Sequence, residues 1–377
     1  MTSKKVNIMD VCSEIFAGGD APKNRMSIEK TSEYTIPIYS NGEDRDGLYG
    51  YTDFARVSLP SITVSARGTI GYACIRKEPF VPIVRLITIT PIPELIDIHY
   101  LYYAIINFNF SESGTSIPQL TVPMIKQYNF PLPPLDEQRK IAAVLDKVSD
   151  LIAKRRQQLD KLDEMVKARF VEMFGDTIYN PYNWPTQQLE EMADIVSGIT
   201  KGRKTKEQDL IEVPYMAVSN VKDGYIDWTM VRTILATQSE VEQYRLLPDD
   251  ILMTEGGDPD KLGRGAIIQN PPENCIHQNH IFRVRLNEKL LLPCYFAEFL
   301  KHQKAKQYFL RCAKQTTGIA SINMRQLKGL TTLVPPLELQ NQFTDYVAQT
   351  EKTKTTISRS LERLETLKKA LMQEHFG

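Results

Sequence analysis

The sequence predicts an α+β protein built from a duplicated unit, in which two mixed α/β domains alternate with two long helices. Three observations predict this fold class: a motif that recurs at a constant offset, segments of short apolar runs separated by turn residues, and two stretches with a heptad pattern. The motif is Pro133-Pro134-Leu135 with Gln138, which recurs as Pro335-Pro336-Leu337 with Gln340. The match continues to Phe174-Gly175 and Phe376-Gly377, so the sequence contains one unit in two copies.

The repeat divides the chain into four segments: globular residues 1–132, a helical spacer over 133–176, globular residues 177–334 and a second spacer over 335–377. The globular segments are rich in Val, Ile, Thr and Tyr between Gly, Pro and Asn, a composition typical of short strands and loops. They also correspond in outline, since residues 36–41 resemble 213–220. In both 60–71 and 248–265, an apolar strand is followed by a glycine-rich loop with an arginine. We expect one helix over 293–315 and its counterpart over 97–108.

The spacers carry the strongest structural pattern. Apolar residues alternate in steps of four and three, which is typical of a coiled-coil seam. Arg155 interrupts the first seam, and Thr350, Lys354 and Lys368 weaken the second. Asp136, Glu137 and Glu338 suit helix starts, because carboxylates offset the positive end of a helix dipole. The predicted seam residues are Ile141, Leu145, Val148, Ile152, Leu159, Leu162, Val166, Phe343, Val347, Ile357, Leu361, Leu364 and Leu371.

Two such helices would each be about 50 Å long and could not bury an apolar stripe alone. We expect them to pair antiparallel about a pseudo-two-fold axis, with one globular domain at each end of the coiled coil. Two domains held apart by a rigid spacer are suited to a DNA target made of two half-sites. The geometry therefore favours recognition of a bipartite DNA sequence.

Composition limits the other possibilities. The chain has 377 residues, 42% hydrophobic and 24% charged, which is enough for two or three domains. It has no apolar run near the roughly 20 residues that a membrane span needs, so we expect a cytoplasmic protein. Its five cysteines include no C-x-x-C pair, which argues against a disulfide framework and a zinc ribbon. The formal net charge is zero, so a nucleic acid would have to be bound by local basic patches.

These features resemble the specificity subunits of Type I restriction-modification systems, whose pattern is two target-recognition domains alternating with two helical regions. The resemblance covers nearly the whole chain. Its most specific residues are Pro133–Gln138, Ile141-Ala142, Leu145-Asp146, Glu255–Asp258 and Lys261–Gly265. The second helix begins differently, with Leu337-Glu338-Leu339-Gln340, and the first recognition segment is shorter and opens with Gly18–Pro22.

The resemblance implies a non-catalytic chain with no cofactor or metal of its own. Two methyltransferase subunits would dock through the helical spacers and modify adenine at N6 in each half-site, using S-adenosylmethionine. Restriction subunits driven by ATP, with Mg, would join that complex. The chain itself would bind double-stranded DNA, with one half-site for each recognition domain.

Candidate DNA contacts lie in loops. Arg67 lies between Ser65 and Gly68, and Arg264 lies between Gly263 and Gly265. Such loops permit close approach to a backbone or groove, although either residue could be an exposed arginine in a tight turn. Lys201, Arg203, Lys204 and Lys206 form a basic loop that either contacts phosphates or is merely solvated. His277, Gln278 and Asn279 either hydrogen-bond within the domain or contact DNA. The other candidates are Lys23, Arg25, Asn41, Ser65, Gly68, Thr115, Asn220, Glu255, Gly256, Gly257, Lys261 and Thr317.

Motifs for catalysis are incomplete. Residues 270–273 read Asn-Pro-Pro-Glu, without the aromatic residue of an adenine methyltransferase motif, and are better explained as a turn. Cys275, His277 and His280 lack a fourth zinc ligand at the usual spacing, and their segment is strand-like. Pro248-Asp249 lacks the acidic-x-Lys triplet of a nuclease, and no phosphate-binding G-x-x-x-x-G-K-[ST] motif occurs. Two alternatives stay open, a stand-alone DNA-modifying enzyme and a coiled-coil scaffold without DNA specificity.

Overall fold

A computed structural model describes residues 4–108, 119–203, 209–257, 262–316 and 319–377. The chain forms two compact units. Unit 1 comprises residues 1–157 and 358–377, and unit 2 comprises residues 158–357. Each unit contains β-sheets, short helices and a segment of both long helices, so the predicted α+β class is confirmed.

Unit 1 is organised around a four-stranded antiparallel sheet with strand order β2-β8-β5-β6. The inner strands β5 and β8 are buried along their whole length, as expected for Ile-rich and Thr-rich strands with both faces covered. A second sheet has the order β4-β3-β7, with β3 antiparallel to β4 and parallel to β7. The strands are β1 (Lys5–Asn7), β2 (Cys12–Ala17), β3 (Ile36–Tyr39), β4 (Leu48–Thr52), β5 (Ser61–Val64), β6 (Ala73–Arg76), β7 (Val81–Pro82), β8 (Ile87–Pro91) and β9 (Asn129–Pro131).

Unit 2 repeats this topology. Its four-stranded sheet has the order β11-β18-β14-β16, and its three-stranded sheet has the order β13-β12-β17, again with one parallel pair. Unit 2 also contains a three-stranded sheet with the order β15-β20-β19. The strands are β10 (Thr186–Gln188), β11 (Ala193–Ser197), β12 (Ile211–Met216), β13 (Arg232–Ala236), β14 (Ile251–Thr254), β15 (Gly256–Gly257), β16 (Gly265–Ile267), β17 (Ile276–His277), β18 (Ile281–Leu286), β19 (Lys314–Thr316), β20 (Ile319–Ser321) and β21 (Thr331–Leu333).

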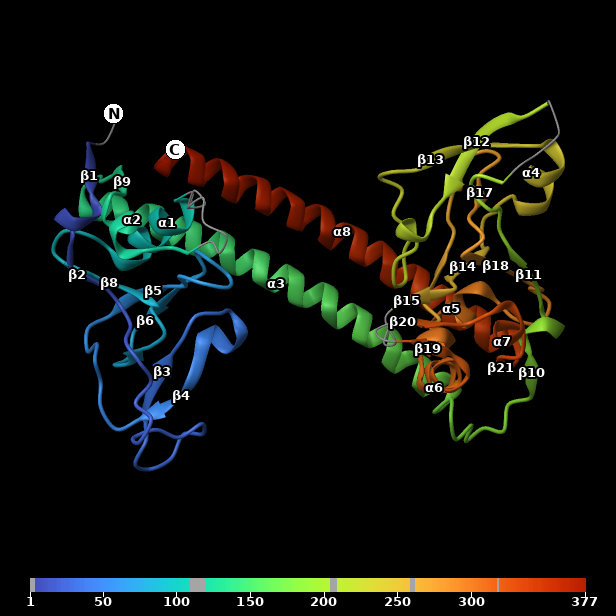
Figure 1. The fold of residues 1–377 in the computed structure, drawn as a ribbon, viewed down its shortest axis with the longest axis horizontal. Coiled ribbons are helices and arrows are strands. Elements are labelled where there is room, and N and C mark those ends of the chain that lie inside the picture. Colours follow the sequence, from blue (N-terminus) through green and yellow to red (C-terminus); the bar gives the residue numbers. More distant parts are fainter. Residues whose placement is uncertain (1–3, 109–118, 204–208, 258–261, 317–318) are drawn as a thin grey trace. The chain divides into compact units, whose positions relative to one another are not determined.

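Short helices cover the sheets and connect the strands (Figure 1). In unit 1, α1 contacts β5 and β6, and in unit 2, α5 contacts β16. The first and last strands of each globular part, β1 with β9 and β10 with β21, also pair in an equivalent way. The short helices are α1 (Ile98–Asn107), α2 (Val122–Lys126), α4 (Gln238–Tyr244), α5 (Pro293–Lys301), α6 (Gln303–Cys312) and α7 (Met324–Lys328), with 3₁₀ turns η1 (Ile8–Asp10), η2 (Asp44–Gly47), η3 (Leu189–Glu191) and η4 (Val218–Asn220).

One helix prediction is confirmed and another is wrong. The helix expected over 97–108 is α1, whose N-cap Asp97 accepts hydrogen bonds from the next turn. The helix expected over 293–315 is instead two helices, α5 and α6, followed by strand β19. The break is His302, which has an extended backbone (φ −89°, ψ 162°) and stacks its ring on Phe170 with centroids 4.4 Å apart. Tertiary packing has overridden helical periodicity there.

The long helices α3 (Leu135–Phe174) and α8 (Leu337–Phe376) contribute residues to the cores of both units. In unit 1, the first turns of α3 share a core with the last turns of α8, and Arg156 pairs with Glu365 at 2.7 Å. In unit 2, the last turns of α3 pack with the first turns of α8, and Lys354 pairs with Asp163 at 2.8 Å. The helices therefore run antiparallel within each unit, as the sequence predicts.

The side chains of the predicted heptad seam differ in how deeply they are buried. Phe343 is fully buried, while the two seam residues that follow the predicted interruption at Arg155, Leu159 and Leu162, are only half-buried. The residues predicted to weaken the second seam are accommodated, since Thr350 is buried and donates its hydroxyl to the Tyr346 carbonyl at 2.9 Å. Ile141, Leu145, Val148, Ile152 and Val166 are also buried, whereas Val347, Ile357, Leu361, Leu364 and Leu371 are half-buried.

The duplicated motif has a structural role that is the same in both units. The Gln138 amide nitrogen donates to the carbonyls of Pro133 (2.9 Å) and Leu95 (3.2 Å), and its Oε1 accepts from Asp97 N (2.9 Å). This glutamine is 1% exposed. It therefore ties the start of α3 to the segment that leads into α1.

Gln340 repeats all three hydrogen bonds in unit 2. Its amide nitrogen donates to the carbonyls of Pro335 (2.8 Å) and Leu290 (3.1 Å), and its Oε1 accepts from Leu292 N (2.8 Å). It is also fully buried. We call Gln138 and Gln340, with these partners, the glutamine clamps.

Among the described residues, no helix has both the length and the apolar character required to cross a membrane.

Candidate nucleic-acid interface

In unit 1, the loops after β2, β3, β5 and β7 are joined by hydrogen bonds into one surface. Asn41 is the central link, because its Nδ2 donates to the Val84 carbonyl at 2.6 Å and its Oδ1 accepts from Ala66 N at 2.7 Å. The Val84 amide in turn donates to the Gly19 carbonyl at 2.8 Å. We call these four joined loops the loop surface of unit 1.

Unit 2 has an equivalent loop surface after β11, β12, β14 and β17. The Asn279 amide donates to the Ile199 carbonyl at 3.0 Å, which matches the bond between Val84 and Gly19. Gln278 accepts from Val218 N through its side chain at 3.4 Å. The same strand ends therefore present the same connected loops in both units.

A glycine in each unit permits this connection. A Cβ on Gly18 would lie 2.6 Å from the Pro82 carbonyl carbon, and a Cβ on Gly198 would lie 1.9 Å from the His277 carbonyl oxygen. Both distances are too short for any side chain. The two glycines are equivalent. Gly18 follows β2 and lies against β7, and Gly198 follows β11 and lies against β17.

The predicted cations of unit 1 differ in their availability. Lys23 is exposed. Arg25 is also exposed but pairs with Asp53 at 2.7 Å, and Arg67 donates from Nη2 to Gln119 Oε1 at 3.1 Å. A bidentate arginine would have to leave its carboxylate before it could bind a phosphate. Lys23 and Arg67 are the better candidates for DNA contact.

The small residues predicted beside Arg67 have separate roles. Gly68 has φ +68° and open space around it, so it supplies the backbone conformation of the turn after β5. Ser65 is 1% exposed, and its hydroxyl accepts from Gly42 N at 3.1 Å. The prediction of Ser65 as a DNA contact is therefore wrong, because its side chain is buried in the support of the loop surface.

Two predicted contacts in unit 2 are also engaged within the fold. Arg203 forms a bidentate contact with Glu240, which lies at the start of α4 and has its pKa lowered mainly by the arginine hydrogen bond. Asn220 is 4% exposed and donates to the carbonyls of Asp227 (2.8 Å) and Met230 (3.0 Å). The prediction of Asn220 as a DNA contact is wrong, although its sequence counterpart Asn41 does lie in the loop surface.

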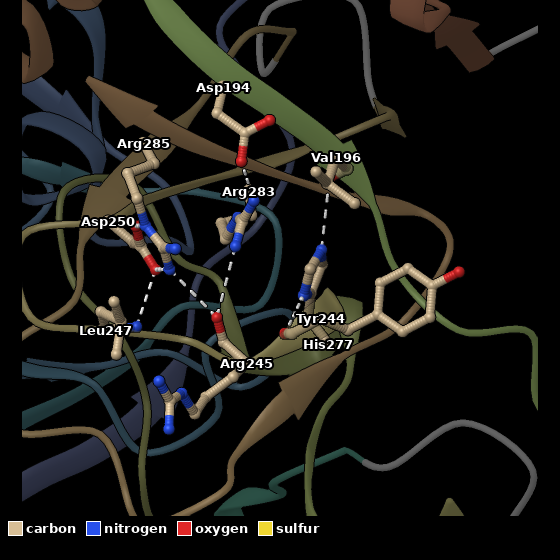
Figure 2. Close-up of polar contacts among 9 residues, drawn as sticks. All are labelled: Asp194, Val196, Tyr244, Arg245, Leu247, Asp250, His277, Arg283 and Arg285. Atoms are coloured by element: carbon tan, nitrogen blue, oxygen red, sulfur yellow. Dashed lines mark hydrogen bonds and ion pairs between the residues drawn. The ribbon is translucent and has the colours of Figure 1, made fainter. Parts of the chain in front are cut away.

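His277 is completely buried, so the prediction that it touches DNA is wrong and the alternative of hydrogen bonding within the domain holds. Figure 2 shows its ring between two backbone carbonyls, with Nδ1 3.1 Å from Tyr244 O and Nε2 3.3 Å from Val196 O. Burial lowers the pKa of His277 to about 4. A neutral ring carries one N–H and can donate to only one of these carbonyls, that of Tyr244 in α4 or that of Val196 in strand β11.

Two arginines lie beside His277 in the same polar network (Figure 2). Arg283, 3% exposed, contacts Asp194, and Arg285 pairs with Asp250 through hydrogen bonds of 2.7 and 2.8 Å. Burial lowers the pKa of Arg283, whereas the hydrogen bond that Arg285 donates to Asp250 raises the pKa of Arg285. These charges hold the sheet behind the loop surface together and are not available to a ligand.

The exposed part of the unit 2 loop surface carries polar and charged groups. His280 pairs with Glu255 at 2.5 Å, and the half-buried Asn279 contacts the same histidine at 3.4 Å. Lys201 is exposed after β11. Gly256 and Gly257 form β15, which pairs with β20. Because the Gly256 Cβ position is crowded by Ala320, this glycine allows two strands to approach closely.

Arg264 lies in a cluster of cations, of which it alone was predicted from the sequence. A cavity of about 290 Å³ is lined by Arg264 together with Lys167 of α3, Lys301 of α5 and Lys306 of α6, and by one carboxylate, Asp223. Lys301 is already paired with Glu298 at 2.8 Å. A concentration of positive charge at one cavity favours an anionic ligand such as a backbone phosphate.

Another missed feature is the Val84–Arg85 pair, which hydrogen-bonds to two other loops of the unit 1 loop surface. No residue pattern marks these positions, because their importance lies in the backbone angles and in bonds to distant loops. Five predicted contacts cannot be placed: Thr115, Lys204, Lys206, Lys261 and Thr317 lie outside the described residues.

The residues considered for other chemistry do not assemble a site in the described parts of the chain. His277 directs both ring nitrogens at backbone carbonyls, and Cys275 is buried. No group of three His, Cys, Asp or Glu residues there could hold a metal. The Asn-Pro-Pro-Glu segment leads into a turn, as expected, in which Cys275 N donates a hydrogen bond to the Pro272 carbonyl at 3.1 Å.

The fold and the paired loop surfaces define a class of duplicated binding proteins in which two similar modules are each built onto a long helix. The chain belongs to the family described as the Type I restriction modification DNA specificity domain, which matches residues 2–163 and 181–367. The match covers both globular segments and most of both long helices.

Two curated relatives illustrate the likeness. The protein assigned as the MjaX type I restriction enzyme specificity subunit of Methanocaldococcus jannaschii is 28% identical over 197 residues, 52% of this chain and 46% of the relative. The EcoKI specificity subunit of Escherichia coli is 21% identical over 281 residues, 70% of this chain and 60% of that protein. The chain thus spans about half the length of the first relative.

Solved structures share the fold. The S subunit of a Type I restriction-modification system from M. genitalium matches with a TM-score of 0.62 and 16% identity, covering 99% of this chain and 96% of that one. A chain from a study of complex assembly in a type I restriction-modification system matches with a TM-score of 0.56 and 16% identity, covering 99% and 97%.

Proposed function

We propose that this chain is the DNA sequence-specificity subunit of a Type I restriction-modification complex. Each unit would recognise one half of a bipartite DNA target through its loop surface. The observation that carries the proposal is the duplicated loop surface, formed in both units by the same strand ends and connected by equivalent hydrogen bonds. Exposed cations and amides on these loops suit phosphates and base edges.

The long helices would dock two methyltransferase subunits, which would modify adenine at N6 in each half-site. S-adenosylmethionine would be bound by those subunits, and ATP and Mg by the restriction subunits that join them. This chain would supply no catalytic residue and would act in the cytoplasm, where it meets its DNA. Its contribution would be to hold the DNA that flanks a flipped adenine, since flipping costs a few kcal/mol.

The test is co-expression of the chain with its neighbouring methyltransferase gene, followed by genome-wide mapping of N6-methyladenine. We expect a split motif with a fixed gap that appears only when both genes are present. Methylation of a single continuous motif, or the same motif without this chain, would contradict the proposal. Methyl transfer by the purified chain alone would support a stand-alone enzyme, and a complex without sequence selectivity would support a scaffold.

A further inference from the structure

The turn at Val84 and Arg85 has an unfavourable backbone. Leu86 N donates to the Ile83 carbonyl at 3.0 Å and closes a four-residue turn, whose central residues have φ +52° and +62°. Two positive φ angles define a type I′ turn, which strongly prefers Asn and Gly. A β-branched valine at positive φ is an outlier. The sequence therefore places Val and Arg where Asn and Gly would cost less.

The fold gains little from either side chain. Val84 is 47% exposed and so does not fill the core, and Arg85 is exposed. Within the described part of the chain, Arg85 has no ion pair or side-chain hydrogen bond. Strained backbone persists where the surrounding structure enforces it, and it concentrates at binding sites.

The surrounding loops do enforce this turn. Val84 N and Arg85 N donate to the carbonyls of Gly19 (2.8 Å) and Gly18 (3.0 Å), and the Val84 carbonyl accepts from Asn41 Nδ2 (2.6 Å). All of the partners belong to the loop surface. Three hydrogen bonds thus hold the turn within the proposed interface, with an apolar and a cationic side chain exposed next to each other.

We propose that Val84 and Arg85 form the base-reading tip of unit 1, an inference that rests on the proposed DNA-specificity function. In the major groove, Arg85 donates two hydrogen bonds to O6 and N7 of a guanine, and Val84 packs on the methyl group of a neighbouring thymine. Arginine with guanine and an apolar side chain with thymine are the pairings that groove geometry favours. A rigid backbone keeps the ordering cost of these contacts low.

Unit 2 carries different residues at the equivalent turn. Ile281 N donates to the Gln278 carbonyl at 3.0 Å, and the central residues are Asn279 and His280, neither with a positive φ. Asn reads adenine through N6 and N7. The two half-sites are therefore read by chemically different tips on the same scaffold.

The experiment uses the chain co-expressed with its methyltransferase subunit. Genomic N6-methyladenine is mapped for the unmutated complex, for Arg85→Ala and for the control Lys77→Ala. Lys77 is an exposed cation that follows β6, at the strand end opposite the loop surface. We expect Arg85→Ala to relax one guanine position in one half of the motif by roughly 5- to 150-fold in preference. The other half and the Lys77→Ala motif should be unchanged.

A second variant separates a reading role from a structural one. Val84→Asn combined with Arg85→Gly gives the turn the residues it prefers, so the Tm should rise by about 2–4 °C while the same half-site loses discrimination. A lower Tm, or an unchanged motif in either variant, would overturn the inference. So would equal weakening on all duplexes with a flatter salt dependence, which indicates a phosphate contact. If the unmutated complex gives no split motif, it is the proposed function that fails.

Discussion

At the residue scale, burial determines which polar groups can meet a ligand. His277, Ser65 and Asn220 looked suitable for DNA in the sequence, yet each is buried and hydrogen-bonded to backbone groups. Sequence shows which chemistry a residue can perform but not which way its side chain faces. Val84 and Arg85 are the converse case, since their strain is visible only in φ angles and not in composition.

His277 should make the stability of the protein depend on pH. Its folded pKa of about 4 lies below the ordinary value of 6.5, so between these values the unfolded chain binds a proton that the folded chain does not. Stability should be constant above pH 6.5 and fall by up to about 3 kcal/mol as the pH drops toward 4. Urea unfolding at several pH values measures this.

The control for that prediction is a pair of variants. His277→Gln should be less stable at pH 7 but should lose most of the pH dependence between 4 and 6.5. His375→Gln, at the end of α8, should behave like the parent chain. Equal pH dependence in all three proteins would show that burial of His277 is not the cause.

Lys306, in the cavity beside Arg264, should act through phosphates. Lys306→Ala is expected to weaken binding of the methyltransferase complex to all duplexes alike and to reduce the slope of log K against log salt by about 1. Titrations at several salt concentrations measure the slope. Lys289→Ala, an exposed lysine between β18 and α5, is the matched control. A sequence-selective loss for Lys306→Ala would indicate a base contact instead.

At the element scale, periodicity and repetition were reliable guides. The constant offset of the proline-leucine-glutamine motif and the heptad pattern located α3 and α8, and the correspondence with residues 293–315 located α1. The break at His302 could not be predicted, because it depends on stacking against Phe170 from a distant helix. The loop surfaces were anticipated only as glycine-rich segments, since their hydrogen bonds join residues far apart in the sequence.

The glutamine clamps should contribute strongly to stability. Gln138→Ala removes three hydrogen bonds and leaves backbone groups of Pro133, Leu95 and Asp97 without that partner, so we expect a loss of about 2–3 kcal/mol in the free energy of unfolding. Gln340→Ala should cost a similar amount. Chemical denaturation measures both.

An exposed glutamine provides the comparison. Gln157→Ala, on the solvent side of α3, should change the free energy of unfolding by less than about 0.5 kcal/mol. If Gln138→Ala were equally mild, then water or a rearranged helix start would satisfy those carbonyls, and the repeated motif would need another explanation.

At the scale of the whole molecule, the duplication predicts that the two units act independently. Each has its own core, its own loop surface and its own glutamine clamp. Replacing residues 1–132 with the segment of another family member should change one half of the methylated motif and leave the other half intact. Methylome mapping of the hybrid complex measures this, and a change in both halves would refute independent recognition.

The turn around Val84 suggests how such a protein acquires new targets. Main-chain hydrogen bonds hold the turn, from Leu86 N to Ile83 O and from Val84 N to Gly19 O. Any amino acid other than proline can supply these main-chain groups. Substitutions at the two central positions therefore leave the supporting bonds in place. Changes in two codons would alter the bases read at this turn without a new fold, so recognition can diversify faster than the scaffold that carries it.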